Sequence, residues 1–234
     1  MAEILERIDP LKQLGLVPLC RLEHLKRYSL AYDKINPVCN VLDIACGFGY
    51  GSGILAKKAS RVVGVDLSEE AINYAVKTYG LPNIEFIVSD IEEFSCPGEF
   101  DAVTCFETIE HVRRPEKALK KLHENLKPSG ILYLSVPNGV YDNKANNFHI
   151  HQFEREELKS LLEKCGFNVE MEYCQHPFAG IVLKMLSRGD NPRGDGNTKS
   201  VLHNLPLIPE LSARLYPKHF ADTALGIYYI ARAL

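Results

Sequence analysis

The sequence lacks three features that would set it apart from ordinary globular proteins. It contains no run of about 18 apolar residues, so no membrane-spanning helix is expected. Its 7 cysteines include no Cys-x-x-Cys pair, which favours reduced and mostly buried thiols. The stretch 1–9 carries Glu3, Glu6 and Asp9, unlike the basic start of a secretory signal. We therefore expect a cytoplasmic protein.

The sequence also has no excess of positive charge. Lys and Arg number 27 against 30 Asp and Glu, which gives a formal net charge of −3. A nucleic-acid footprint normally needs a basic face, and no basic stripe with interleaved aromatic residues is present. We therefore expect a small-molecule substrate rather than nucleic acid.

What the sequence does contain is a repeated alternation of strand-like and helix-like segments. Apolar runs predict strands over 40–45, 61–66, 84–88, 100–105, 131–136, 168–174 and 225–233. Amphipathic runs with start and stop signals predict helices over 51–58, 68–79, 115–126 and 154–165. Repeated strand-then-helix order predicts a doubly wound α/β fold with a mostly parallel, seven-stranded sheet. The last two strands follow one another without a crossover helix, so one of them should be antiparallel.

Two segments lie outside this alternation. Residues 1–36 look helical and precede the first strand, which favours an N-terminal helical cover over the ligand crevice. The domain proper is expected over 37–234, with a substrate-side insertion at about 176–222. The centre of that insertion, residues 187–200, is rich in Gly, Asn, Asp and Ser and is loop-like.

The segment Val41–Gly51 reads as a strand, a tight glycine turn and the start of a helix. Such a turn lets backbone approach a ligand at the carboxyl ends of the strands. A glycine pattern alone is also found in dehydrogenases. Three acids make the assignment of the ligand more specific. Asp43 suits a ligand with an ammonium group, bound directly or through water, and Asp66 suits two ribose hydroxyls. Asp90 suits an adenine amino group, with Ile91 packed on the ring.

Strand-end acid, glycine loop, second acid and adenine-side Asp resemble the class I S-adenosylmethionine methyltransferases over residues 24–174, which implies their Rossmann-like fold and S-adenosyl-L-methionine as cofactor. Ala45 departs from the resemblance, because the commonest pattern has glycine there. The cofactor-binding candidates are Arg27, Tyr28, Asp43, Ala45, Gly47, Gly49, Asp66, Leu67, Asp90, Ile91 and Phe106.

An Arg27-Tyr28 pair precedes the first strand on a predicted helix, where His24 shares its face by i, i+3 and i+4 spacing. Bacterial methyltransferases often linked with surface-sugar assembly carry a similar Arg-Tyr. The resemblance implies that Arg27 pairs with the methionine carboxylate of the cofactor. An exposed helix face is the other interpretation.

Glu107-x-x-Glu110-His111 follows the fourth strand, where residues should flank the reactive methyl group. His149 and His151 lie two apart downstream, so in an extended segment they should point the same way. The segment resembles the metal site of small-RNA 2′-O-methyltransferases and a similar motif in quinone-biosynthesis O-methyltransferases. This resemblance implies a Mg²⁺ or Mn²⁺ site of Glu107, Glu110, His111 and His151. Alternatively the acids cap a turn and a histidine acts alone as general base; the catalytic candidates are His149, His151, Glu107 and His111.

The acceptor is less constrained than the cofactor. We expect O-methylation of a small-molecule hydroxyl, such as that of a nucleotide-linked or surface-polysaccharide sugar. The alternatives are a metal-assisted RNA 2′-O-methyltransferase, a quinone or phenol O-methyltransferase, and a non-catalytic cofactor-binding scaffold. An amine acceptor stays open, and apolar stretches near 178–186 and 201–215 allow a homodimer.

Overall fold

The structure is a computed structural model that describes residues 9–11, 18–138, 149–175 and 226–234. The insertion expected at about 176–222, with its loop at 187–200, lies wholly outside these residues. No helix of the described ranges is both long enough and apolar enough to cross a bilayer. The five cysteines whose side chains are described, at positions 39, 46, 96, 105 and 165, are free thiols.

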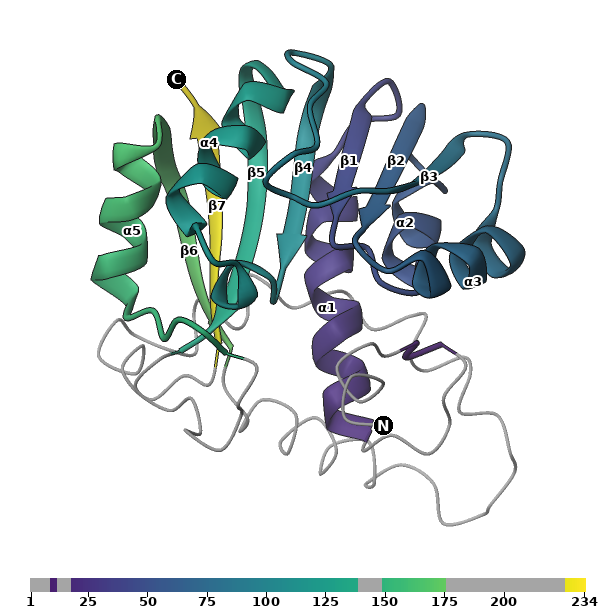
Figure 1. Ribbon diagram of the computed structural model, residues 1–234, viewed down its shortest axis with the longest axis horizontal. Helices are drawn as coiled ribbons and strands as arrows, with labels where there is room; N and C mark the ends of the chain where they lie inside the picture. Colours follow the sequence, from purple (N-terminus) through teal and green to yellow (C-terminus); the bar gives the residue numbers. More distant parts are fainter. Residues whose placement is uncertain (1–8, 12–17, 139–148, 176–225) are drawn as a thin grey trace.

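Strands and helices alternate along most of the chain (Figure 1). In chain order they are α1 Pro18–Lys34, β1 Asn40–Ile44, α2 Tyr50–Leu55, β2 Arg61–Asp66, α3 Glu69–Tyr79, β3 Ile84–Val88, β4 Phe100–Phe106, the 3₁₀ turn η2 Ile109–His111, α4 Pro115–Asn125, β5 Leu126–Pro137, α5 Arg155–Lys164, β6 Phe167–Gln175 and β7 Gly226–Ala233.

The seven strands form one sheet in the order β3-β2-β1-β4-β5-β7-β6. Strands β1 to β5 pair in parallel, whereas β7 lies antiparallel between β5 and β6. This confirms the doubly wound, mostly parallel α/β fold with one antiparallel strand in the last pair. The strand order reverses between β1 and β4, and ligands bind beside such a reversal at the carboxyl ends of parallel strands.

Both faces of the sheet are covered, which is why its strands read as continuous apolar runs. Alternate residues of β1 show the division: Leu42 packs on the side of α4 and α5, and Val41 packs on the side of α1 and α2. In Figure 1, α1 runs along β1 and projects beyond the carboxyl ends of the parallel strands. Helix α1 is therefore both a core element and a neighbour of the crevice.

Local sequence signals explain most of the helix boundaries. Ser68 caps α3 by accepting the Ala71 N–H at 3.2 Å. Pro115 opens α4, and Glu154 forms a capping box with Glu157 at the start of α5. Two expected boundaries were wrong: α2 ends at Leu55 rather than near position 58, and β5 begins at Leu126 rather than at 131. After Leu55 the chain leaves the helix through a turn whose N–H groups bond back to residues 52, 54 and 55.

Candidate functional site

The turn between β1 and α2 carries three residues with left-handed backbone. Ala45 has φ 54°, Gly47 has φ 54° and Gly49 has φ 79°. A Cβ on Gly49 would lie 2.6 Å from the Cβ of Ala75, so glycine is required there. A Cβ on Gly47 would meet nothing within 4 Å, so this stretch of backbone faces open space. The turn is thus packed on one side and open to a ligand on the other.

Asp43 lies in β1 directly below this turn and has no exposed surface. Its carboxylate accepts hydrogen bonds from the hydroxyls of Tyr28 at 3.0 Å, Ser52 at 2.6 Å and Thr104 at 2.7 Å. Burial raises the Asp43 pKa to about 6, against the lowering effect of these three hydroxyls. Asp43 therefore supports the turn from within, and the structure gives it no face for direct contact with a ligand.

Asp66 ends β2, the next strand of the sheet, and is 6% exposed. One carboxylate oxygen accepts the Gly47 N–H at 2.9 Å, and the other accepts the Ser68 N–H at 2.9 Å. The acid thereby joins the glycine turn to the cap of α3. Leu67 follows it with 67% of its surface exposed, at the edge where an adenosyl group was expected.

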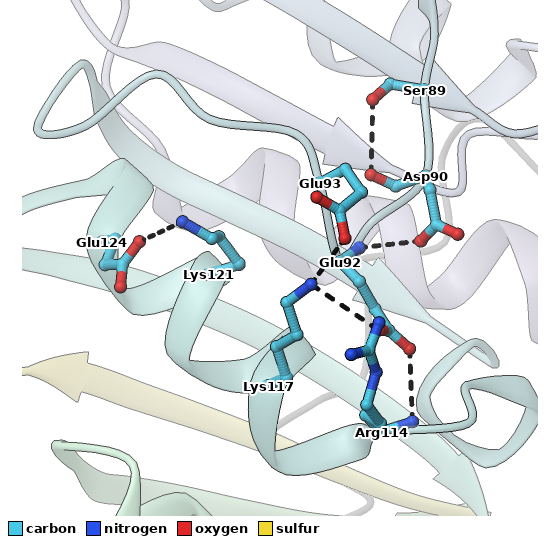
Figure 2. A network of polar contacts seen from close by, with 8 residues as sticks. All are labelled: Ser89, Asp90, Glu92, Glu93, Arg114, Lys117, Lys121 and Glu124. Atoms are coloured by element: carbon cyan, nitrogen blue, oxygen red, sulfur yellow. Dashed lines mark hydrogen bonds and ion pairs between the residues drawn. The ribbon is translucent and has the colours of Figure 1, made fainter.

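Asp90 follows β3 and sits in a turn held by charged groups (Figure 2). Its carboxylate accepts the Glu92 N–H at 2.8 Å. The buried Glu92 accepts the Arg114 N–H at 3.2 Å and also pairs with the Arg114 guanidinium. Ile91 lies between the two acids and packs against the core. The adenine-side turn is therefore tied to the segment that precedes α4.

Arg27 and Glu107 meet at the carboxyl end of β4. The Arg27 guanidinium lies 3.2 Å from a Glu107 carboxylate oxygen, and the two side chains are 10% and 26% exposed. Glu107 has φ 48°, a strained backbone for a non-glycine residue. Ser135 of β5 holds it twice: the Ser135 hydroxyl donates to the carboxylate at 2.8 Å, and the Ser135 carbonyl accepts the Glu107 N–H at 2.9 Å.

Aromatic rings connect this ion pair to the glycine turn. The Tyr28 ring lies 4.9 Å from Phe106 and 5.2 Å from Tyr50, and it fills the space above Gly51. His24 lies 3.4 Å from the Tyr50 hydroxyl, and burial together with the Arg27 charge lowers the His24 pKa to about 4. His24 is therefore neutral near pH 7, and Arg27 carries the positive charge of this part of the crevice.

The acid and histidine candidates divide into separate groups. Ligand atoms of Glu110, His111 and His149 lie within 4.8 Å of one another, and the two histidine rings are in edge-on contact. His151 instead stacks on Phe153 at 5.6 Å.

The structure groups these candidates differently from the prediction. The predicted quartet of Glu107, Glu110, His111 and His151 is not brought together, because Glu107 is drawn to Arg27 and His151 to Phe153. The two downstream histidines have different ring neighbours: His149 contacts His111, whereas His151 stacks on Phe153. The N–H groups of Ile150 and His151 both donate to the Glu110 carbonyl.

Residues 35–177 match the family described as "Methyltransferase domain". The chain belongs to this methyltransferase family. Over 206 residues it is 29% identical to a protein of Mycobacterium tuberculosis named a probable S-adenosylmethionine-dependent methyltransferase, covering 84% of this chain and 74% of that protein. This protein is thus an S-adenosylmethionine-dependent methyltransferase of class I, as the three acids and the glycine turn had indicated.

Other matches agree on the methyltransferase fold. A ubiquinone biosynthesis O-methyltransferase of Xanthomonas campestris is 36% identical over 126 residues, which span 52% of each chain. The solved S-adenosylmethionine-dependent methyltransferase of Mesorhizobium loti superposes with a TM-score of 0.63 at 17% identity, covering 90% of this chain and 99% of that one. At that identity the superposition shows the fold alone.

The methyltransferase site also uses residues that sequence reasoning missed. These are Ser52 and Thr104, which hold Asp43, Ser135, which holds Glu107, and Glu92, which ties down the turn at Asp90. Register offers a signal for one of them, because Thr104 of β4 lies directly opposite Asp43 of β1. The contacts of Ser52, Ser135 and Glu92 join different elements of the fold, and the sequence alone does not tell how close those elements lie.

Proposed function

We propose that this methyltransferase transfers the methyl group of S-adenosylmethionine to a hydroxyl of a small molecule, with a sugar-type hydroxyl as the first candidate. The observation that carries the proposal is the group of Glu110, His111 and His149 just beyond β4. It sets two imidazoles and a carboxylate at the edge of the crevice where the methyl acceptor is expected.

The residues present fit the cofactor. Gly47 offers open backbone, Asp66 stands at the tip of β2, and Asp90 follows β3 beside an exposed apolar edge at Leu67. When bound, S-adenosylmethionine supplies an electrophilic methyl group on its sulfonium. The three tips lie side by side because β1, β2 and β3 are neighbours in the sheet.

The work left to the chain is to orient the acceptor and to remove its proton. A sugar hydroxyl is a weak nucleophile, so a base within hydrogen-bond reach speeds its attack by about 10²- to 10⁴-fold. His111 or His149 would take the proton onto a ring nitrogen while the oxygen bonds to the methyl carbon. Bound S-adenosylmethionine would supply the methyl group of this displacement, and its sulfur would be the leaving group that keeps the electron pair.

A phenolic hydroxyl is the second candidate acceptor. It rests on the relatives named ubiquinone biosynthesis O-methyltransferases, which are 35–36% identical over about half of this chain. A phenol is more acidic than a sugar hydroxyl and depends less on a base. Replacing both His111 and His149 should therefore reduce activity on a phenol less than activity on a sugar.

If a divalent cation takes part, Glu110, His111 and His149 are the residues proposed to bind it. Carboxylate and imidazole ligands suit Mn²⁺ or a similar ion, which would lower the pKa of an acceptor diol bound to it. Full activity of the purified protein in excess EDTA would dismiss the ion and leave the histidine base.

The proposal is tested by incubating the protein with methyl-labelled cofactor and panels of nucleotide-linked sugars, phenols, amines and short RNA. Label on a sugar hydroxyl supports it, and label on RNA or on an amine overturns it. His149→Ala should reduce turnover by about 10²-fold or more on the accepted sugar. A protein that binds S-adenosylmethionine in calorimetry but labels no acceptor of the panels would instead support the non-catalytic scaffold.

A further inference from the structure

A buried acid near the N-terminus binds to helix α3. Figure 1 draws residues 9–11 as a short purple piece near α3, and Asp9 is 1% exposed. Its carboxylate accepts hydrogen bonds from the hydroxyls of Tyr74 at 3.1 Å and Tyr79 at 2.8 Å, and from the Leu11 N–H at 3.0 Å. Burial and the hydrogen bond to Asp9 raise the pKa of both tyrosines, so their hydroxyls stay protonated and donate. Asp9 therefore ties residues 9–11 to α3.

The two tyrosines that hold Asp9 also support the glycine turn and the helix that follows it. The ring of Tyr74 packs on Phe48 in the middle of the turn, with 4.8 Å between the ring centres. The ring of Tyr79 fills the space above Gly53 of α2, where an added Cβ would lie 2.9 Å from it. Each tyrosine thus presents its hydroxyl to Asp9 and its ring to the cofactor turn or to α2.

Helix α2 is also contacted from its other side by the N-terminal part of the chain. The ring of Tyr28, from α1, fills the space above Gly51. Gly51 and Gly53 are two residues apart, which is about 200° around a helix, so α1 and α3 pack on opposite sides of α2. The N-terminal residues therefore reach α2 directly through Tyr28 and indirectly through Asp9 and α3. The cofactor turn, which opens α2, is positioned by both contacts.

We propose that Asp9 is a positioning residue for cofactor binding, such that its docking on α3 and the occupation of the glycine turn by the cofactor favour each other. With Asp9 docked, the two tyrosine rings hold Phe48 and Gly53 in place, and the turn needs less ordering when the cofactor arrives. By linkage, the bound cofactor must strengthen the docking of Asp9 by the same factor. The inference rests on the cofactor of the family and is independent of the acceptor that is methylated.

The first test measures the affinity for S-adenosylhomocysteine, the cofactor without its methyl group, by calorimetry. Couplings between two sites are typically about 5- to 150-fold, so Asp9→Ala should bind this ligand at least about 5-fold more weakly than the parent. The double variant Tyr74→Phe, Tyr79→Phe keeps both rings, removes both hydroxyls and should weaken binding by a similar factor. Adding Asp9→Ala to the double variant should weaken binding no further, because the contact is already lost. Losses that multiply would show that Asp9 does not act through these hydroxyls and would overturn the inference.

Asp101→Asn is the matched control for a general loss of stability. Asp101 also accepts a backbone N–H, that of Asn40 at 2.8 Å, but at the amino end of β1 and away from the glycine turn. Because distant sites without shared partners do not couple, this variant should leave the affinity for S-adenosylhomocysteine within about 2-fold of the parent. An equal loss in Asp101→Asn and Asp9→Ala would overturn the positioning role.

The second test measures the docking itself with a single tryptophan, because the sequence contains none. Leu11 is 45% exposed, so Leu11→Trp adds a fluorophore two residues from Asp9, and acrylamide quenching reports its exposure. Adding Asp9→Ala should increase the quenching, and saturating S-adenosylhomocysteine should partly reverse the increase. Quenching that Asp9→Ala does not change, an increase that the ligand does not reverse, or increased quenching with parent-like affinity would each overturn the inference. A panel that labels no sugar would refute the proposed acceptor and leave both tests unaffected.

Discussion

At the scale of single residues, the buried Asp43 makes stability depend on pH. Burial raises its pKa from 3.8 to about 6. The folded state then holds the Asp43 proton more tightly than the unfolded state, so this group stabilises the fold fully below its unfolded pKa. That stabilisation is lost as the pH rises through about 6.

Asp43→Asn should abolish this dependence. The free energy of unfolding of the parent minus that of the variant should increase as the pH falls from 7 to 5, because only the parent gains a proton at this site. Urea unfolding at several pH values measures the difference, and the subtraction removes the other carboxylates, which titrate alike in both proteins. A difference that stays flat over this range, or shrinks toward pH 5, would show that the Asp43 pKa is not raised.

At the scale of elements, the turn between β1 and α2 contains two glycines, Gly47 and Gly49. Both have left-handed backbone, but their surroundings differ. Gly47→Ala meets only the left-handed backbone cost of about 1 kcal/mol. Gly49→Ala adds overlap with Ala75 and Phe86, where the new Cβ would lie 2.6 and 2.9 Å from their atoms. Overpacking costs about 1–3 kcal/mol more. Urea unfolding should therefore rank the parent above Gly47→Ala and Gly47→Ala above Gly49→Ala, and equal losses would contradict the packing.

The turn after β3 gives a second comparison between neighbours (Figure 2). Glu92 is buried and anchors the Arg114 backbone, whereas Glu93 is exposed and pairs only with Lys117 in the network drawn. Glu92→Gln should reduce the free energy of unfolding by about 1 kcal/mol, because the Arg114 side chain can turn to water once its partner is lost. Glu93→Gln serves as the control and should leave the unfolding midpoint unchanged. A larger effect at Glu93 would show that the exposed pair carries the turn.

At the scale of the whole molecule, the sequence predicted the scaffold better than the contacts between its parts. The strands 61–66 and 84–88 are found with the expected bounds, because apolar runs between turns set them locally. The Arg27–Glu107 ion pair and the hydrogen bonds of Tyr28 and Thr104 to Asp43 could not be predicted, because they depend on where α1 lies against β1 and β4. His149 contacts His111 and His151 stacks on Phe153, a difference that the two-residue spacing of these histidines does not reveal.

The same packing bears on whether residues 1–36 are separable from the domain. Helix α1 and the residue that follows it bury Tyr28, Leu30, Ala31 and Ile35 in one cluster with Val41 of β1. Each large apolar side chain contributes about 1.5–3 kcal/mol on burial, so their sum approaches the roughly 5–15 kcal/mol that holds a whole domain together. Removal would also take one hydroxyl from the buried Asp43.

A chain beginning at residue 37 should therefore fail to unfold cooperatively and should expose apolar surface. Circular dichroism melting and binding of a hydrophobic dye measure both effects. The full chain with Tyr28→Phe is the matched control, because it loses the Asp43 contact and keeps the apolar packing, and it should still melt in one transition. If residues 37–234 alone melt sharply and bind the cofactor, the N-terminal segment is a detachable cover. If they do not, α1 is part of the core, and the cofactor crevice is assembled only when the N-terminal residues have folded onto the sheet.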